Sequence, residues 1–168
     1  MTPQPVTNGV NMQALSQLVA SIQEDSNLAK SKFRISNKWI SGGVNQTHVQ
    51  DFQSLGRENA HLQDFELQAD EPLALGGTDS AANPVEHLLN ALASCVTTSI
   101  VAHAAVRGIP VEEIESQLEG DIDIRGFLGL APSVPKGYQD IRFTLKIKAA
   151  PEDLPKLREL ADFSPVYN

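Results

Sequence analysis

Residues 76–110 read GGTDSAANPVEHLLNALASCVTTSIVAHAAVRGIP, and this stretch carries the start and stop signals of one long helix. Asn83 can cap the first turn, Pro84 suits the first helical position, and Glu86 lies three residues after the cap. Gly108 and Pro110 form a stop, because glycine adopts the left-handed conformation and proline cannot continue a helix. The stretch therefore predicts a helix over residues 84–107.

This predicted helix is apolar or small on nearly every face, which is typical of a central helix in a domain. Glu86, Asn90 and His103 are among the polar residues that interrupt it, so we do not expect it to span a membrane. Cys95, the only cysteine of the chain, lies in its middle. The function depends on whether Cys95 reacts or only packs.

Length and composition limit the class of protein. A chain of 168 residues suggests one domain with a real core. The net charge of −8 and the pI of about 4.9 argue against a nucleic-acid partner. A single cysteine excludes an internal disulfide and suits a reducing compartment, so we expect a cytoplasmic protein. Residues 1–13 have no charged region and no long apolar run, so they do not predict a secretory signal.

The remaining elements follow from hydrophobic periodicity and from turn residues. Residues 1–10 are polar and contain proline, and we expect them to be disordered. The predicted fold class is α+β, with antiparallel strands packed on central helices. We expect a leader with a short helix over residues 1–31 and one domain over residues 32–168. The predicted elements are an amphipathic helix at 15–22, strands at 32–40, 44–52, 61–69, 113–125 and 138–148, a loop at 126–137 and a last helix at 151–163.

The run ADEPLALGGTDSAANPVEHLLNALASC, followed by a β-hairpin, a helix and DFSPVY, resembles the OsmC-like family. That family includes osmotically induced proteins and organic hydroperoxide resistance proteins. The resemblance covers roughly residues 32–168. It implies an α+β fold with antiparallel sheets packed on two central helices, formed by an intertwined homodimer. It also implies that relatives continue with a short last strand beyond the position of Asn168, so a natural end and a truncation both stay open.

The peroxidase members of the family use one cysteine to attack the peroxide and a second to resolve it as a disulfide, assisted by an arginine and a glutamate. Cys95 falls on the attacking cysteine, and Ser164 falls where the resolving cysteine is expected. A serine hydroxyl cannot form a disulfide, so the resemblance implies a divergent member without the two-cysteine cycle. The arginine is Arg57 by our first choice, with Arg34 as the alternative.

The assisting glutamate of the family directly follows the proline, but Val85 occupies that position here. Glu86 is one residue late. The step from Glu86 to Cys95 advances about 900°, which places the two on opposite faces of the helix at 3.6 residues per turn. Glu86 is therefore better explained as part of the helix cap.

The residues themselves leave the role of Cys95 open. A thiolate attacks peroxide far faster than a thiol, and Cys95 lies too far from the helix start to gain much from its dipole. It would need a cation from elsewhere in the fold; otherwise it is a small buried apolar residue. Ser164 has no histidine and aspartate placed to activate it, and it reads as a small residue at a chain corner. His61 could line a pocket with Arg57 or be an exposed strand residue.

Other sites are not indicated. The histidines have no metal-binding spacing, and no motif implies a cofactor. The acidic residues between 112 and 123 are expected to form the solvated face of a strand.

Two hypotheses remain. In the first, Cys95 reduces a small apolar peroxide at the interface of a homodimer, and an external thiol recycles it. In the second, a non-catalytic homodimer binds a small apolar ligand there. The retained Cys95 favours the first, whereas Ser164 and the displaced Glu86 favour the second.

Overall fold

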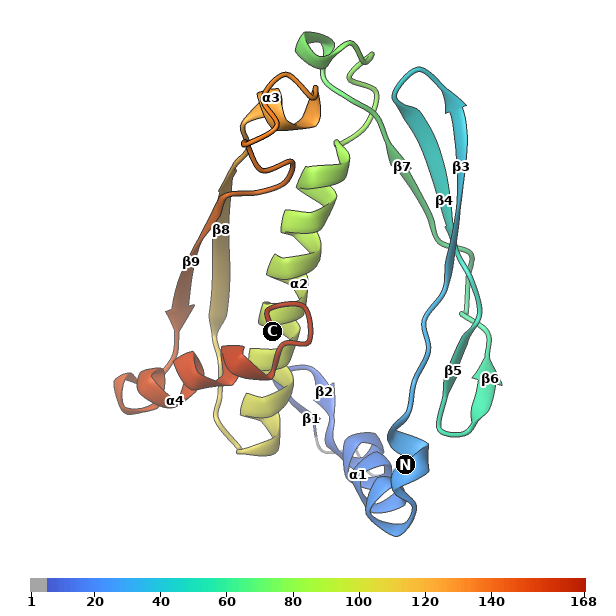
Figure 1. Cartoon of the computed structure of the whole chain (residues 1–168). Coiled ribbons are helices and arrows are strands. Elements are labelled where there is room, and N and C mark those ends of the chain that lie inside the picture. The colour runs from blue at the N-terminus through green and yellow to red at the C-terminus, as the bar shows by residue number, and fades with distance from the viewer. Residues whose placement is uncertain (1–5) are drawn as a thin grey trace. The chain divides into compact units, whose positions relative to one another are not determined.

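The structure is a computed structural model and describes residues 6–168 (Figure 1). Contacts divide the chain into two units: an N-terminal unit, residues 11–87, and a C-terminal unit, residues 6–10 with 88–168. The N-terminal unit contains α1 (Met12–Glu24), η1 (Ser26–Ala29), β3 (Ile35–Ser41), β4 (Val44–Val49), β5 (Phe52–Ser54), β6 (Arg57–Asn59), β7 (Glu66–Ala69) and η2 (Leu73–Leu75). The C-terminal unit contains β8 (Glu113–Asp121), α3 (Ile124–Phe127), β9 (Asp140–Lys148), η3 (Pro151–Asp153), α4 (Leu154–Glu159) and η4 (Leu160–Phe163). The long helix α2 (Pro84–Val106) begins in the first unit and continues into the second.

Residues 6–10 correct one expectation, because they are ordered. They form the hairpin of β1 (Val6–Thr7) and β2 (Val10–Asn11), whose turn is Asn8-Gly9 with positive φ at both residues. The Asn8 side chain donates to the Ile109 carbonyl at 2.9 Å and accepts the Val111 N–H at 3.0 Å. The rest of the predicted disordered segment, residues 1–5, lies outside the described residues.

The N-terminal unit is built on a three-stranded antiparallel sheet of order β3-β4-β7. Ile35 pairs with Val49, and Thr47 pairs with both Asn37 and Leu67, so the register carries Ile35, Val49 and Leu67 on one side of the sheet. In this unit only Ala69 and Asp70 are buried among the described residues. Ile35, Trp39 and Leu67 are each at least half exposed, so the unit has almost no core of its own.

The C-terminal unit has a core in which helix α2 packs against the antiparallel hairpin β8–β9 (Figure 1). Val96, Ile100 and Ala104 are spaced four residues apart on α2 and are fully buried. The inward residues of the hairpin cover them from one side, and Leu157 and Leu160 of the last helical segment complete the cluster. These contacts identify α2 as the central helix that its composition predicts.

Helix α2 would be long and apolar enough to cross a membrane by length and composition alone, with a hydropathy of 1.5. The core helix of a globular protein passes the same test. Val96, Ile100 and Ala104 pack against β8–β9, so α2 is the core helix of the C-terminal unit.

Most predicted strands are confirmed, but four segments differ from the prediction. β7 is shorter than the predicted strand 61–69, and the short hairpin β5–β6 was not predicted in this form. The predicted last helix is three pieces, η3, α4 and η4. Pro155, near the start of α4, lacks the N–H that would continue the helix from η3. The predicted loop 126–137 begins inside the one-turn helix α3.

Candidate functional site around Cys95

Cys95 lies in the middle of α2 and is half-buried. Its neighbour Val96 is fully buried with Ile100 in the core of the C-terminal unit. Because adjacent helical residues differ by about 100° in direction, Cys95 lies beside this buried stripe and not within it. Cys95 is not a member of the core cluster, so the thiol keeps part of its surface outside the packing of its own unit.

No hydrogen bond joins the Cys95 sulfur to another side chain within residues 88–168. Within these residues the thiol therefore has no hydrogen-bonded cation that would favour the thiolate. Arg57 and Arg34 both belong to the N-terminal unit, and their pairing with Cys95 stays a prediction.

The two candidate arginines differ in what they already bind. Arg34 makes a bidentate pair with Glu58, at 2.8 and 3.0 Å, and donates to the Asp51 carbonyl at 3.1 Å. This pairing raises the pKa of Arg34 and lowers the pKa of Glu58, with the hydrogen bond as the largest cause of both shifts. Arg57 lies on β6, and its guanidinium has no hydrogen bond or ion pair among the described residues. Of the two, Arg57 is the arginine available to a new partner.

Glu86 is part of a reciprocal helix cap, as its spacing predicts. The Asn83 side chain accepts the Glu86 N–H at 2.9 Å, and the Glu86 carboxylate accepts the Asn83 N–H at 2.8 Å. Both bonds satisfy backbone donors at the start of α2. A role for Glu86 beside Cys95 finds no support in these contacts.

Ser164 is fully buried at the turn that follows η4. Its hydroxyl accepts the Tyr167 N–H at 3.3 Å, and its carbonyl accepts the Tyr167 N–H at 3.2 Å and the Asn168 side-chain amide at 2.9 Å. These bonds close a chain corner, which agrees with a small residue in that place.

The residue before Ser164 is held by an aromatic stack that sequence reasoning missed. The rings of Phe163 and His103 are 4.1 Å apart, and Arg107 lies over Phe163 at 5.5 Å from the ring centroid. Burial, and secondarily the positive charge of Arg107, lowers the pKa of His103 and so favours its neutral form. No sequence pattern links Phe163 to His103, because the two residues are distant along the chain.

His61 lies in a row of aromatic rings. Its ring is 5.0 Å from that of Phe52 and 5.4 Å from that of Phe65, and Phe52 also stacks on Phe33 at 5.6 Å. These contacts account for His61 without an arginine partner. A shared pocket of His61 and Arg57 stays a prediction.

Asp70 is the main polar residue that the sequence analysis did not single out. It is fully buried and directly follows β7, in the run ADEP. Its carboxylate accepts hydrogen bonds from the Thr78 and Ser80 backbone at 3.0 and 3.1 Å, from their hydroxyls at 2.5 and 2.9 Å, and from the Glu71 N–H at 2.8 Å. These bonds, with that of the Thr78 hydroxyl the strongest, hold the pKa of Asp70 well below its usual range. The sequence signal is an aspartate followed by a glycine-rich loop with two hydroxyl residues.

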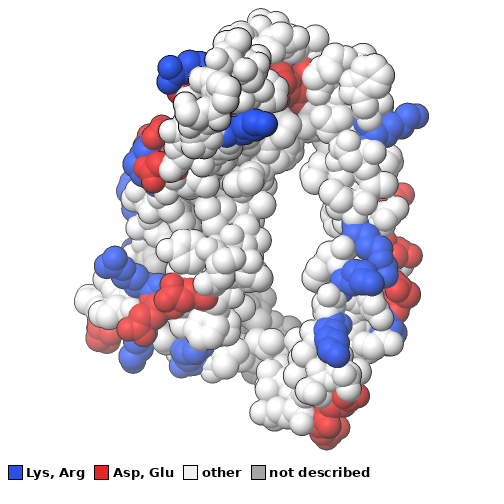
Figure 2. Space-filling model, in the orientation of Figure 1, with Lys and Arg blue, Asp and Glu red and all other residues white. Residues whose placement is uncertain are grey.

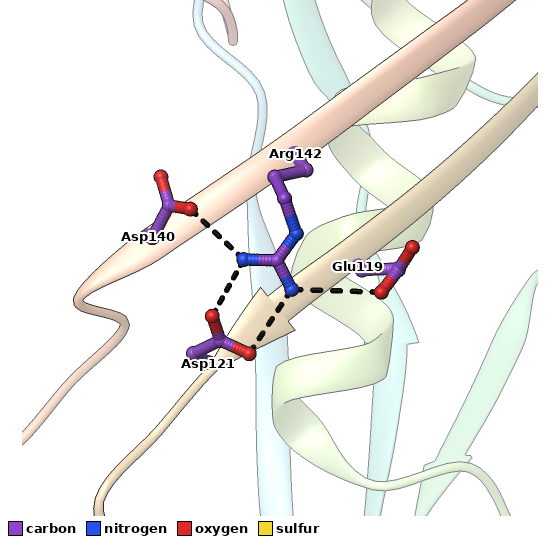
Figure 3. Close-up of polar contacts among 4 residues, drawn as sticks. All are labelled: Glu119, Asp121, Asp140 and Arg142. Carbon is purple, nitrogen blue, oxygen red and sulfur yellow. Dashed lines mark hydrogen bonds and ion pairs between the residues drawn. The ribbon is translucent and has the colours of Figure 1, made fainter.

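The acidic strand β8 has an exposed face, as predicted, and it is paired with basic residues of β9. Figure 3 shows Arg142 of β9 between three carboxylates, with Asp121 as its strongest partner. Asp140 lies at 2.9 Å and Glu119 at 3.5 Å from its guanidinium nitrogens. In Figure 2, acidic and basic groups accordingly lie side by side at that end of the hairpin. No group of three or more histidine, cysteine or carboxylate residues within residues 6–168 could hold a metal ion.

The comparisons with known proteins agree with this architecture. The family model described as "OsmC-like protein" matches residues 77–168, which is more than half of the chain. No curated protein matches the chain. The OsmC-like protein from Mycoplasma pneumoniae has a similar structure, with a TM-score of 0.57 and 17% identity, over 82% of this chain and 85% of that one.

Two further solved structures are similar. An organic hydroperoxide resistance protein from Legionella pneumophila gives a TM-score of 0.53 at 18% identity, covering 80% of this chain and 85% of its own. An OsmC-like protein of unknown function from Vibrio cholerae gives 0.51 at 14% identity, covering 82% and 92%. The chain belongs to the OsmC-like protein family. At these identities the solved structures establish the fold, and the chemistry of the site has to be argued from the residues of this chain.

Proposed function

We propose that this protein is a thiol-dependent redox protein of an oxidative-stress response, in which Cys95 reduces organic hydroperoxides. Membership of the family supports a general OsmC-like stress role, and the similar Legionella protein is described as an organic hydroperoxide resistance protein and predicted redox protein. The observation that carries the proposal is the position of Cys95, half-buried on the central helix but outside the core cluster.

The reaction needs one cysteine and an external thiol. The Cys95 thiolate attacks the terminal oxygen of the hydroperoxide, an S–O bond forms, and the O–O bond breaks. The leaving alkoxide takes a proton and departs as an alcohol, and Cys95 becomes a sulfenic acid. An external thiol condenses with it, releasing water and leaving a mixed disulfide. A second external thiol then regenerates Cys95 and leaves with the first as a disulfide.

Arg57 is the proposed partner of the thiolate. It is preferred to Arg34 because the guanidinium of Arg34 is already bound to Glu58. Ser164 cannot resolve the sulfenic acid, which is why the cycle requires a reductant from outside.

The proposed functional form is a cytoplasmic homodimer that takes up a small apolar peroxide between its subunits. Two features support the dimer. The N-terminal unit leaves Ile35 and Trp39 more than half exposed. In the most apolar 18-residue stretch of α2, only 22% is buried within one chain. Apolar surface of this extent favours association with a second copy.

A second candidate function is a non-catalytic dimer that binds a small apolar ligand at the same interface. Its support is that no hydrogen bond from residues 88–168 reaches the Cys95 sulfur, together with the serine at position 164.

The rate of Cys95 oxidation separates the two functions. The purified protein is mixed with cumene hydroperoxide or with hydrogen peroxide, and the sulfenic acid is trapped and measured by mass spectrometry. We expect oxidation by cumene hydroperoxide at pH 7 to be at least about tenfold faster than that of free cysteine, since free cysteine with a pKa of about 8.5 is only a few per cent thiolate at that pH. Cys95→Ser is the control. A rate equal to that of free cysteine would falsify the redox proposal and leave ligand binding.

A further inference from the structure

The hairpin β5–β6 carries an arginine and a phenyl ring on the same face. It continues from the ends of β4 and β7 (Figure 1), and its two-residue turn, Leu55-Gly56, has positive φ at both residues. This turn places Arg57 directly opposite Ser54. Opposite residues of an antiparallel pair share a face, and so do residues two apart on one strand. Phe52 therefore lies on the face of Arg57, at a diagonal position within reach of a long side chain.

The segment before β3, residues 31–34, adds a second phenyl ring to this face. Lys32 and Gln53 exchange both backbone hydrogen bonds, at 2.8 and 2.9 Å, so Phe33 lies on the face of Phe52. The two phenyl rings are stacked, with centroids 5.6 Å apart and planes at 19°. Phe33 is 75% exposed, so one side of its ring is open to a ligand.

The charged residues of these segments are divided between the two faces of the hairpin. Lys32 and Arg34 alternate with Phe33 and so lie on the opposite face, where Arg34 binds Glu58 at 2.8 and 3.0 Å. Asp51, which precedes β5, is on that side too, and after Glu58 its negative charge also raises the pKa of Arg34. Within residues 31–34 and 51–59, the face of the two phenyl rings thus has one charged group, the guanidinium of Arg57.

Acidic residues occur at the other end of the row of rings. The row continues from Phe52 through His61 to Phe65, and Asp64 and Glu66 flank Phe65 in the chain. The Glu66 carboxylate is already bound, by the side chains of Gln46 at 2.8 Å and His48 at 3.2 Å. An anionic ligand is therefore expected at the end with Phe33 and Phe52, beside the arginine.

The charge of Arg57 decides which kind of occupant fits this face. An apolar surface that covered the two phenyl rings would also bury the guanidinium without an anion, which is unfavourable. A ligand with an aromatic ring and a carboxylate satisfies both groups, since rings stack on rings and a carboxylate forms two parallel hydrogen bonds with a guanidinium. The hydroxyls of Ser31 and Ser54, 3.0 Å apart, offer further donors beside Phe33.

We propose that this face of the hairpin binds an aromatic carboxylate. Its ring packs on Phe33 and Phe52, and its carboxylate pairs with Arg57. Binding is independent of the thiol of Cys95. One consequence rests on the proposed function: Arg57 is also the proposed partner of the Cys95 thiolate, so a bound carboxylate competes with the thiolate and slows its oxidation.

The probe is 2-naphthoate, whose binding to the full chain is measured by calorimetry and by the fluorescence of the probe. The same titration is made with Cys95→Ser, and we expect saturable binding of equal affinity. Two matched compounds separate the contributions of ring and charge. We expect at least about fivefold weaker binding of naphthamide, which lacks the charge, and of cyclohexanecarboxylate, which lacks the aromatic ring.

Two variants test the residues of the face. Phe33 is largely exposed and the Arg57 guanidinium has no partner among the described residues, so their replacement leaves the fold intact. We expect at least about tenfold weaker binding of 2-naphthoate by Arg57→Gln and about threefold weaker binding by Phe33→Leu. The matched controls are Arg158→Gln and Phe127→Leu in the C-terminal unit, which should bind as the parent does.

Four results would overturn the proposed site. They are no saturable binding of 2-naphthoate, equal binding of naphthamide, equal binding by Arg57→Gln, and equal binding by Phe33→Leu. Affinity that falls as the protein concentration rises would assign the face to a second copy of the chain and would also overturn it.

Oxidation of Cys95 tests the competition. We expect saturating 2-naphthoate to slow oxidation by cumene hydroperoxide at least about fivefold, because the carboxylate occupies the cation that favours the thiolate. An unchanged rate with bound 2-naphthoate would overturn the competition. A rate equal to that of free cysteine without ligand, together with normal binding of 2-naphthoate, would contradict the proposed function and support the ligand site.

Discussion

At the scale of residues, the two candidate arginines can be distinguished by what their guanidinium groups already bind. Arg34 is held by Glu58 and by the Asp51 carbonyl, and Arg57 has no such partners among the described residues. A thiolate gains most from a cation that is not already neutralised by a carboxylate.

We therefore predict that Arg57→Ala slows oxidation of Cys95 by cumene hydroperoxide about tenfold or more, because a nearby cation changes the thiolate population by about that factor. Arg34→Ala should change the rate less than threefold. Arg125→Ala is the matched control, since Arg125 pairs with its own neighbour Asp123. Stopped-flow kinetics gives the rates. The opposite order, with Arg34→Ala slow and Arg57→Ala unchanged, would transfer the role to Arg34.

At the scale of elements, the loop between β7 and α2 is fixed by one carboxylate. The Asp70 carboxylate accepts hydrogen bonds from the backbone and hydroxyl groups of Thr78 and Ser80 and from the Glu71 N–H, and it has no basic partner among residues 6–168. Gly77 lies in this loop so close to Glu71 that a Cβ would overlap the Glu71 carbonyl. The loop that leads to the start of α2 is thus held by hydrogen bonds to a single buried anion.

We predict that Asp70→Asn lowers the melting temperature at pH 7 by several degrees. The amide nitrogen of asparagine cannot accept the hydrogen bonds that one carboxylate oxygen accepts, so N–H and O–H donors of the loop are left unsatisfied. The pKa of Asp70 is lowered on folding, so its contribution is present above the usual carboxyl range and is lost as the pH falls below it. The difference in melting temperature between the parent and Asp70→Asn should therefore shrink below about pH 4. A difference that stays constant from pH 7 to pH 3 would contradict this account.

Local signals in the sequence were sufficient for most elements. The Asn83–Glu86 cap fixed the start of α2, and the alternation of Phe143, Leu145 and Ile147 fixed β9. The Asn8-Gly9 turn was an equally local signal, and polar composition concealed it. The last helix could be foreseen as helical, but not its division into η3, α4 and η4.

The candidate site could be predicted only in part, because its contacts are long-range. Cys95 and its helix follow from the sequence, but the His103–Phe163 stack joins distant segments without any pattern. Asp70 accepts hydrogen bonds from residues up to ten positions away in the following loop. Helix and strand propensities do not predict hydrogen bonds of this kind. The proposed pairing of Cys95 with Arg57 would also be a long-range contact, which no local pattern predicts.

At the scale of the whole molecule, the distribution of burial is the main argument for a second copy. Of the described residues of the N-terminal unit, only Ala69 and Asp70 are buried, although its sheet carries Ile35, Trp39 and Leu67. On α2, Leu88 is 49% exposed and lies on the same side as Cys95 by helical spacing. A small unit that exposes such residues is stabilised when another apolar surface covers them.

We predict that the protein is a dimer in sedimentation equilibrium at micromolar concentration, and that Leu88→Glu weakens the dimer at least tenfold. A buried charge without a partner opposes association, and two copies of it would lie at a two-fold interface. Leu130→Glu, at a residue 71% exposed in the loop after α3, is the matched control and should remain dimeric. If Leu88→Glu also slows oxidation of Cys95 by cumene hydroperoxide, the peroxide is bound between the subunits. A monomeric parent protein that oxidises at the full rate would show instead that one chain forms the whole site.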